Sequence, residues 1–314
     1  MTFQEKPPWW GGDLQTIRNF LTPNVRALPG VSKDVVIPKN DCSGDQLTAT
    51  LDTPNASIAG PLIVLIHGLT GSKDSRYMMA SSSFHLKHGR QVLRLNLRGA
   101  GSSAKTCQKG YHGGHTSDIG DALVFLSGII KTRGVFLIGY SLGGNILINF
   151  LSKTNDRKIL GAATVSASID PEAAALRLMD LRNVIYQARL LRDMKKEHFK
   201  RNPDLSDERQ QVVSRIKSIY TFDDKVTAPE YGYKDAKDYY FKTNGARKIP
   251  NLDIPLLMIS AINDPWIPSD SYKKLIDNSP LNIKILLSAG GGHVGFHEKG
   301  QEETWYDRQI NCFI

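Results

Sequence analysis

A serine flanked by glycines ends an apolar run in the stretch Gly139-Tyr140-Ser141-Leu142-Gly143. The stretch matches the pattern G-x-S-x-G, follows the apolar segment VFLI and precedes LGGNILINFLS, which can form a helix. In this strand–turn–helix setting a serine hydroxyl projects above the edge of a sheet. The glycines on either side let the strand and the helix approach each other around a strained turn. The pattern predicts a nucleophilic Ser141. The alternative is a glycine-rich turn without chemistry.

A serine hydroxyl is a weak nucleophile unless a base accepts its proton and an acid orients that base. His293 lies in SAGGGHVGF, directly after an apolar strand pattern, and we predict it as the base. Asp264 lies in LLMISAINDPWIP, between another strand pattern and a proline, and we predict it as the acid. The nearest rival is Asp270, but its position suits the first turn of the next helix.

Two backbone amides are predicted to form an oxyanion hole. Leu142 follows the nucleophile at the first turn of a helix, where free N–H groups favour an anion. The second candidate is Leu69 in PLIVLIHGLTGSKDS, where a strand pattern opens into a loop of small residues at Gly68. A glycine there permits a conformation that points the Leu69 amide at the nucleophile. The alternative is an ordinary loop between a strand and a helix.

These residues require a sheet whose strands end at one common edge. Apolar strand patterns alternate with helical ones, which is typical of βαβ units and a mostly parallel sheet. The first two strand patterns are more polar and closely spaced, and they predict an antiparallel edge hairpin. The eight predicted strands are Val35–Pro38, Gln46–Asp52, Leu62–His67, Gln91–Asn96, Val135–Tyr140, Leu160–Ser166, Leu256–Ala261 and Ile283–Ser288.

Helical patterns fill the segments between the strands. Apolar residues recur every three or four positions from Ile119 to Ile130, and Thr116 or Ser117 is placed to cap that helix. Ser269 is placed to cap a second helix, DSYKKLID.

A long segment between the sixth and seventh strands has a different texture. From Ala173 to Ile219 it is helical, charged and rich in Arg and Lys. We therefore predict an α/β core formed by residues 1–168 and 251–314, and an inserted helical cap at residues 169–250. The alternative is a set of ordinary helices on the sheet face. Six apolar cap residues are compatible either with an acyl-binding site or with the cap's own core: Leu176, Leu178, Met179, Leu181, Val184 and Ile185.

The formal net charge of +9 raises the question of a polyanionic partner. Lys and Arg are interspersed with Asp and Glu, without an arginine-rich stripe or a nucleic-acid-binding signature, so no nucleic-acid partner is expected. A weak peripheral contact with anionic membrane lipids is compatible with this charge. We expect a cytoplasmic protein, because no segment resembles a secretory signal or a membrane span and the three cysteines do not suggest a disulfide framework. The sequence leaves oligomeric state open.

Two further motifs do not point to a cofactor. His112 and His115 are separated by two glycines and lack a companion set of ligands at metal-binding spacing, so a role in ordering the loop is favoured. LRGAGSS lacks the G-x-x-x-x-G-K-[ST] spacing of a phosphate-binding loop. No metal and no organic cofactor are expected.

Taken together, these motifs resemble the α/β-hydrolase superfamily and, within it, the YheT-like family, which is related to eukaryotic lipid-acting hydrolases and yeast medium-chain alcohol acyltransferases. The blocks that carry the resemblance are PWWGGDLQTI, HGLTGSKDSRYM, LRLNLRGAGSS, YHGGHTSD, GYSLGGNIL and FDDKVTAPEYGYKDAKDYY, together with the loops of Asp264 and His293. The resemblance implies ester substrates and the same three catalytic residues. Asp223 and Asp224 precede the strand that should deliver the acid, so we interpret them as helix-terminal or cap-docking residues.

The main hypothesis is a serine carboxylester hydrolase that acts on short- to medium-chain acyl esters through an acyl-enzyme. One alternative passes the acyl group to an alcohol, which would make the protein an acyltransferase. Another is a lipid hydrolase similar to a phospholipase or a monoacylglycerol lipase. A third is a binding module without catalysis, against which the complete triad argues.

Overall fold

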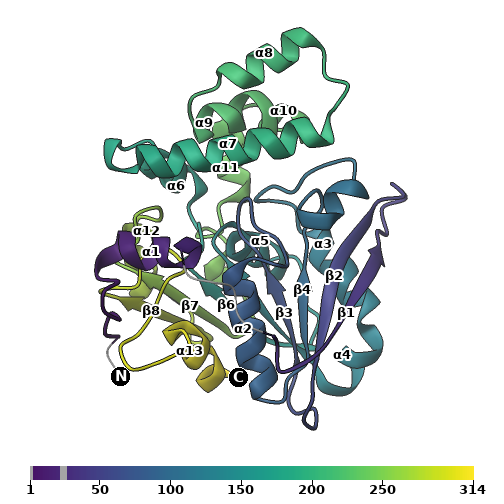
Figure 1. Cartoon of the computed structure of the whole chain (residues 1–314), viewed down its shortest axis with the longest axis vertical. Coiled ribbons are helices and arrows are strands. Elements are labelled where there is room, and N and C mark those ends of the chain that lie inside the picture. The colour runs from purple at the N-terminus through teal and green to yellow at the C-terminus, as the bar shows by residue number, and fades with distance from the viewer. Residues whose placement is uncertain (1–2, 22–26) are drawn as a thin grey trace.

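The computed structural model describes residues 3–21 and 27–314. Eight strands form one sheet in the order β1-β2-β4-β3-β5-β6-β7-β8, with helices on both faces (Figure 1). The strands from β3 to β8 run parallel, whereas β1 and β2 form an antiparallel pair at one edge and β2 pairs antiparallel with β4. The predicted mostly parallel sheet of eight strands, with an antiparallel edge hairpin, is confirmed.

The strands agree with the predicted segments, although β1 begins five residues before its predicted start. They are β1 (Gly30–Pro38), β2 (Gln46–Pro54), β3 (Leu62–Ile66), β4 (Val92–Leu95), β5 (Val135–Tyr140), β6 (Ile159–Val165), β7 (Leu256–Ala261) and β8 (Ile283–Ser288).

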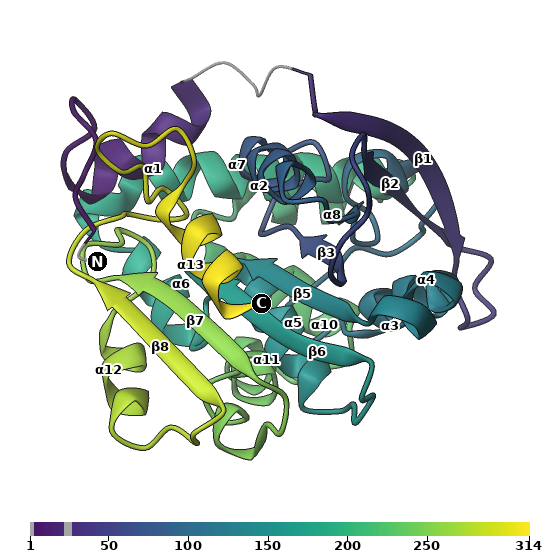
Figure 2. The same ribbon diagram turned by 90° about the horizontal axis from the view of Figure 1, so that it is seen from below.

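Helices cover both faces of the sheet, as Figure 2 shows from below. On one face α3, α4, α5 and α12 pack in one apolar cluster, and on the other α2 and α13 pack in a second. The helices outside the cap are α1 (Gly11–Leu21), α2 (Arg76–Lys87), η1 (Gly101–Lys105), α3 (Ser117–Phe125), α4 (Ser127–Arg133), α5 (Leu142–Leu151), α12 (Asp270–Ile276) and α13 (Trp305–Phe313).

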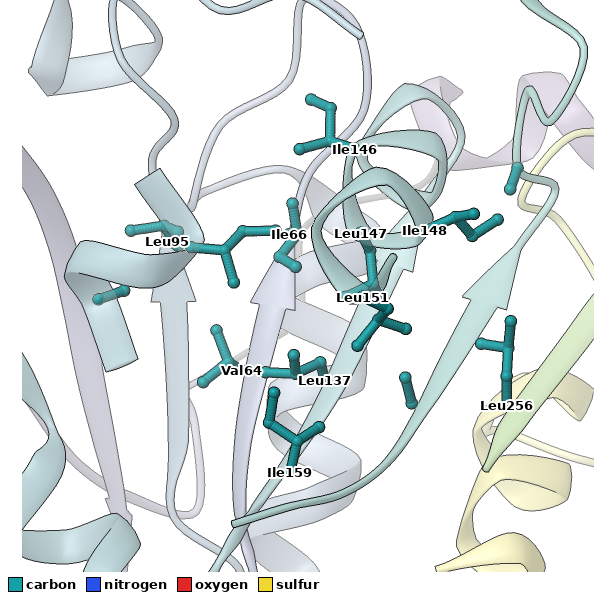
Figure 3. Packing of buried hydrophobic residues seen from close by; sticks show 14 of the residues in the cluster. Val64, Ile66, Leu95, Leu137, Ile146, Leu147, Ile148, Leu151, Ile159 and Leu256 are labelled. Atoms are coloured by element: carbon teal, nitrogen blue, oxygen red, sulfur yellow. The ribbon is translucent and has the colours of Figure 1, made fainter. Parts of the chain in front are cut away.

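Strand β3 is apolar at every position because both of its faces are buried. Along β3, Val64 belongs to the cluster under α5 and its neighbour Ile63 belongs to the cluster under α2. The apolar side chains of α5 meet those of the strands in the first cluster (Figure 3). This packing holds the start of α5 directly above the end of β5.

Two local predictions need correction. The single helix expected from Thr116 or Ser117 to Ile130 is two helices, because the backbone leaves the helical region at Leu126 (φ −91°, ψ 9°). Ser127 and Gly128 follow, and both residue types favour helices poorly. Thr116 and Ser269 do precede their helices, but within the described residues neither side chain makes a capping hydrogen bond.

Between β6 and β7 the chain forms only helices and turns, and the helices from residue 171 to residue 230 lie above the carboxyl edge of the sheet (Figure 1). They are α6 (Pro171–Leu178), η2 (Leu181–Asn183), α7 (Val184–Arg201), α8 (Asp207–Arg215), α9 (Ile219–Phe222), the π-helical turn η3 (Asp223–Thr227), α10 (Ala228–Glu230), α11 (Ala236–Thr243) and η4 (Ile249–Asn251). The cap boundaries at residues 169 and 250 stay a prediction.

The end of the insertion returns to the core helices. Asn145 of α5 donates a hydrogen bond from Nδ2 to the carbonyl oxygen of Thr243 (2.9 Å), and the Tyr239 hydroxyl accepts one from the Gly113 amide (2.9 Å). Across residues 3–21 and 27–314, no helix combines the length and the apolar character needed to span a membrane.

Candidate active site

Ser141 lies in the sharp turn between β5 and α5. Its backbone has a left-handed conformation (φ 52°, ψ −122°), which non-glycine residues rarely adopt. A Cβ atom on Gly139 would lie 2.7 Å from the carbonyl oxygen of Gly143, and one on Gly143 would lie 2.3 Å from that of His67. The glycines of G-x-S-x-G are therefore required by close backbone contact.

The structure brings together three side chains that are far apart in the sequence. The distance from Ser141 Oγ to His293 Nε2 is 2.9 Å, and that from His293 Nδ1 to Asp264 Oδ2 is 3.0 Å. The three residues follow β5, β8 and β7, whose carboxyl ends meet at one edge of the sheet. Since the carboxylate accepts a hydrogen bond from Nδ1–H, the lone pair of Nε2 is directed at the serine hydroxyl.

Backbone amides and an aromatic ring hold the acid and the imidazole. Asp264 is buried, and its Oδ1 accepts hydrogen bonds from the amides of Trp266 (2.8 Å) and Ile267 (3.0 Å), which leaves Oδ2 for His293. The Trp266 ring lies on the imidazole with 4.2 Å between ring centroids. The sequence reasoning did not identify Trp266, although it lies only two residues after Asp264.

The two predicted oxyanion-hole residues lie close to Ser141. Leu69 and Leu142 line the same cavity as Ser141. The loop that carries Leu69 approaches so closely that a Cβ atom on Gly68 would lie 2.9 Å from Ser141 Cβ. Among the described residues, neither the amide of Leu69 nor that of Leu142 donates a hydrogen bond. Their role as an oxyanion hole stays a prediction.

Helix α1 forms hydrogen bonds with the loop that carries His293, and the sequence did not predict this contact. Thr16 Oγ1 accepts a hydrogen bond from the His293 amide (2.8 Å), and Asn19 Nδ2 donates one to the Val294 carbonyl (2.7 Å). Gln15 bonds both the amide (2.8 Å) and the carbonyl (3.1 Å) of His297. The sequence block PWWGGDLQTI contains Gln15 and Thr16 of α1, but its pattern alone does not indicate a contact with the His293 loop.

The loop needs this support because its backbone is strained. Val294 and Phe296 both have positive φ angles (54° and 50°), which cost energy for side chains of this kind. Gln15 and Thr16 are almost completely buried, so their polar groups must be paired inside the protein. Their pairing with the loop therefore stabilises the position of the imidazole.

A cavity of about 540 Å³ separates Ser141 from the cap. Its wall combines residues of the sheet edge with apolar residues of α6, α7, α9 and η3: Leu178, Leu190, Met194, Ile219, Phe222 and Val226. Of the six apolar cap residues noted in the sequence, only Leu178 lines the cavity. The other five are exposed, so neither an acyl-binding role nor a core role describes them: Leu176, Met179, Leu181, Val184 and Ile185.

The cavity also has a charged stripe, because Arg189, Asp193, Glu197 and Arg201 follow one another every four residues along α7. Burial raises the pKa of the Glu197 carboxyl to about 7, although Arg201 opposes the shift. The Nε of Arg201 is buried without a hydrogen-bond partner among the described residues.

The other sequence motifs lie outside the relay of Ser141, His293 and Asp264. Asp223 is buried and accepts hydrogen bonds from the hydroxyls of Tyr240 (2.7 Å) and Thr227 (2.8 Å), and burial raises its pKa to about 6. Asp224 accepts one from the amide of Ala236 (3.2 Å), so both carboxylates order the cap.

In the loop with two glycines, His112 packs against tyrosine rings of the cap, and His115 packs against His112. The His112 ring lies 4.3 Å from that of Tyr231, and burial lowers the pKa of His112 to about 3. Over residues 3–21 and 27–314, no group of three or more His, Cys, Asp or Glu side chains is placed to hold a metal ion.

Comparison with known proteins agrees with this architecture. The family model described as alpha/beta hydrolase fold matches residues 61–300. The chain is 29% identical over 270 residues to a monoacylglycerol lipase of Saccharomyces cerevisiae, an alignment that covers 83% of this chain and 60% of that protein. It is 30% identical over 240 residues to YheT of Escherichia coli, covering 75% of this chain and 70% of YheT.

Among solved structures, an esterase of Pyrococcus furiosus, Pf2001, superposes with a TM-score of 0.60 at 17% identity, covering 93% of this chain and 95% of that one. At this identity the likeness concerns the fold alone. Helix α1, which holds the His293 loop, lies outside the residues that the family model matches.

Proposed function

The chain belongs to the α/β-hydrolase family, and we propose that it is a serine carboxylester hydrolase acting on short- to medium-chain acyl esters. The observation that carries the proposal is the continuous relay from Ser141 Oγ through the imidazole of His293 to Asp264, with distances of 2.9 and 3.0 Å. The fold does not require a strained serine, an oriented histidine and a buried aspartate to lie next to one another. Ester hydrolysis by a serine nucleophile requires all three.

In the first half of the reaction, Ser141 Oγ attacks the ester carbonyl carbon while its proton passes to His293 Nε2. Asp264 stabilises the imidazolium through Nδ1–H. The negative charge on the former carbonyl oxygen is held by the amides of Leu69 and Leu142, each of which contributes roughly 3–4 kcal/mol to such a transition state. When the carbon–oxygen bond to the alcohol breaks, His293 returns the proton to the departing oxygen and an acyl-enzyme remains.

In the second half, water enters the place of the alcohol. His293 accepts a proton from the water, whose oxygen attacks the acyl carbon and regenerates a tetrahedral intermediate. Collapse of that intermediate releases the carboxylic acid, and the proton returns from His293 to Ser141 Oγ. An alcohol in place of the water would instead give a new ester, which is the acyltransferase alternative.

The test is hydrolysis of p-nitrophenyl esters from acetyl to palmitoyl by the wild-type chain and by Ser141→Ala. The proposal is supported if the wild type hydrolyses the esters and Ser141→Ala does not, and if a fluorophosphonate labels Ser141. Folded protein that turns over no ester and takes up no fluorophosphonate would refute it. Added alcohol that diverts product from acid to ester would identify an acyltransferase.

A lipid hydrolase is the second candidate, and the cavity favours it. About 540 Å³ lies within the usual range of small-molecule sites, roughly 300–1,000 Å³, and the cap side of the wall is largely apolar. The yeast relative is named a monoacylglycerol lipase. Arg201 additionally offers a cation to a phosphate group. Comparing monoacylglycerols with lysophospholipids of equal chain length separates the two lipid classes, and Arg201→Met should weaken only the use of the phosphate-bearing substrate.

A further inference from the structure

The outer side of the cap exposes large apolar side chains where α6, η2 and α7 meet. Leu181 is 93% exposed and Ile185 is 80% exposed. Exposed apolar side chains that group together mark an interaction surface. Helix α1 adds further exposed residues beside them, including Leu21 at 66%. We call this surface the outer apolar patch: Leu14, Phe20, Leu21, Leu176, Met179, Leu181, Val184 and Ile185.

The two parts of the patch are adjacent because α1 is tied to the beginning of α7. Asp13 forms an ion pair with Arg182 (2.9 Å) and accepts a hydrogen bond from the Tyr186 hydroxyl (3.1 Å). One turn further along, the Arg189 guanidinium lies 3.9 Å from the centre of the Phe20 ring. Figures 1 and 2 both show α1 beside this end of the cap.

The segment that carries the cap part of the patch is basic. Residues 176–201 contain eight Lys and Arg against three Asp and Glu, and the whole chain has a formal net charge of +9. Exposed apolar side chains surrounded by cations have the chemistry of a surface that inserts into the boundary of an anionic bilayer.

The patch is also continuous with the proposed active site. Phe20, Tyr186 and Arg189 line the cavity above Ser141 and at the same time join α1 to α7 next to the exposed residues. A lipid that leaves a bilayer at the patch would therefore meet the cavity wall directly.

We propose that the outer apolar patch docks on the surface of an anionic lipid bilayer. Leu181 and Ile185 enter the acyl boundary, and the Lys and Arg residues of the cap bind the head groups. The docking itself does not require catalysis. Delivery of a lipid ester from the bilayer to Ser141 rests on the proposed function.

The test is sedimentation of the full chain with vesicles of ether-linked phosphatidylcholine, alone or mixed with ether-linked phosphatidylglycerol, which offer no acyl ester to hydrolyse. Binding is expected only to the anionic vesicles, and added salt should weaken it because the head-group contacts are exposed. The double variant Leu181→Asp, Ile185→Asp should lower the partition coefficient at least tenfold.

The matched control is Leu281→Asp. Leu281 is also fully exposed, but it precedes β8 and so lies toward the edge of the sheet opposite the cap. The control should bind vesicles like the wild type. All three proteins should hydrolyse a soluble butyrate ester at equal rates without vesicles and should unfold at similar temperatures.

Three results would overturn the docking proposal: equal binding of the double variant and the wild type, equal binding to vesicles with and without the anionic lipid, and no vesicle binding by the wild type. If the wild type instead forms a concentration-dependent dimer that the double variant abolishes, the patch is a protein interface. Vesicle binding by a chain that hydrolyses no ester would remove the proposed function and leave the docking intact.

Discussion

The two walls of the cavity above Ser141 are built by different kinds of contact. On the sheet side, short hydrogen bonds fix individual atoms, as with the His293 imidazole between Ser141 and Asp264. On the cap side, an apolar cluster around Met194 and Phe222 forms much of the wall, and Leu181 of the cap is exposed to solvent. Hydrogen bonds there hold Asp223, which is no part of the relay. Directional bonds suit chemistry that tolerates little displacement, and apolar packing suits the binding of variable chains. We therefore expect substitutions on the sheet side to change turnover and those on the cap side to change stability or substrate choice.

The largest expected effect is the loss of the nucleophile. Ser141→Ala should lower kcat/KM for a p-nitrophenyl ester by about 10⁴- to 10⁶-fold, because removal of a triad serine eliminates the covalent route. Ser168→Ala is the control, since Ser168 lines the same cavity but has no part in the relay. It should stay within a few-fold of the wild type. Comparable losses of kcat/KM in both variants would show that the effect is not specific to the relay, and would contradict the expected difference between the two walls.

Removal of the acid comes next. Asp264→Asn should lower kcat by about 10³- to 10⁴-fold, because an amide supports the wrong tautomer of His293 while the shape of the site is retained. The control is Asp270→Asn, which alters the rival carboxylate from the sequence, now found on the surface in an ion pair with Lys273 (3.0 Å). A loss of activity in Asp270→Asn, and none in Asp264→Asn, would reverse the assignment of the acid.

A smaller effect is expected where α1 holds the catalytic loop. Thr16→Val removes the acceptor for the His293 amide, so kcat should fall by about tenfold with KM nearly unchanged, and stability should fall by about 1–3 kcal/mol for the unpaired N–H. Thr16→Ser restores the hydroxyl and should restore the rate. Equal losses of stability without a change in kcat would reduce Thr16 to a purely structural residue.

The last effect is expected on the cap side and concerns the pH dependence of stability, not turnover. Burial raises the pKa of Glu197 from 4.5 to about 7, so between these values the folded chain binds more protons than the unfolded chain. This carboxyl should therefore lower stability as pH rises from about 4.5 to 7, with the full loss present above pH 7.

Glu197→Gln removes that ionisation. Relative to the wild type, its free energy of unfolding should be about 2 kcal/mol higher at pH 8 than at pH 5. Urea unfolding of both proteins at the two pH values measures the difference. Asp223 and Asp307 also have raised pKa values, but they are common to both proteins and cancel in the comparison. A pH dependence that is identical in the two proteins would contradict the buried environment of Glu197.

Features that depend on residues close together in the sequence could be predicted well. All eight strands were expected, because β3 and β5 are apolar at every position and the edge strands are not. The turn at Ser141 was expected because only glycine fits where β5 and α5 cross. The split at Leu126 was missed, since apolar periodicity continues across the break and masked the poor helix propensity of Ser127 and Gly128.

The sequence by itself determined the order of the elements, the turn that exposes Ser141 and the loops from which His293 and Asp264 are presented, because periodicity and turn chemistry are local properties. Only the tertiary structure decided that Thr16 holds the His293 amide from 277 residues away, and that Leu181 and Ile185 face solvent instead of a core. Such contacts depend on which distant surfaces meet when the chain packs. An apolar residue in a helix gives the same sequence pattern whether it faces a core, a cavity or solvent.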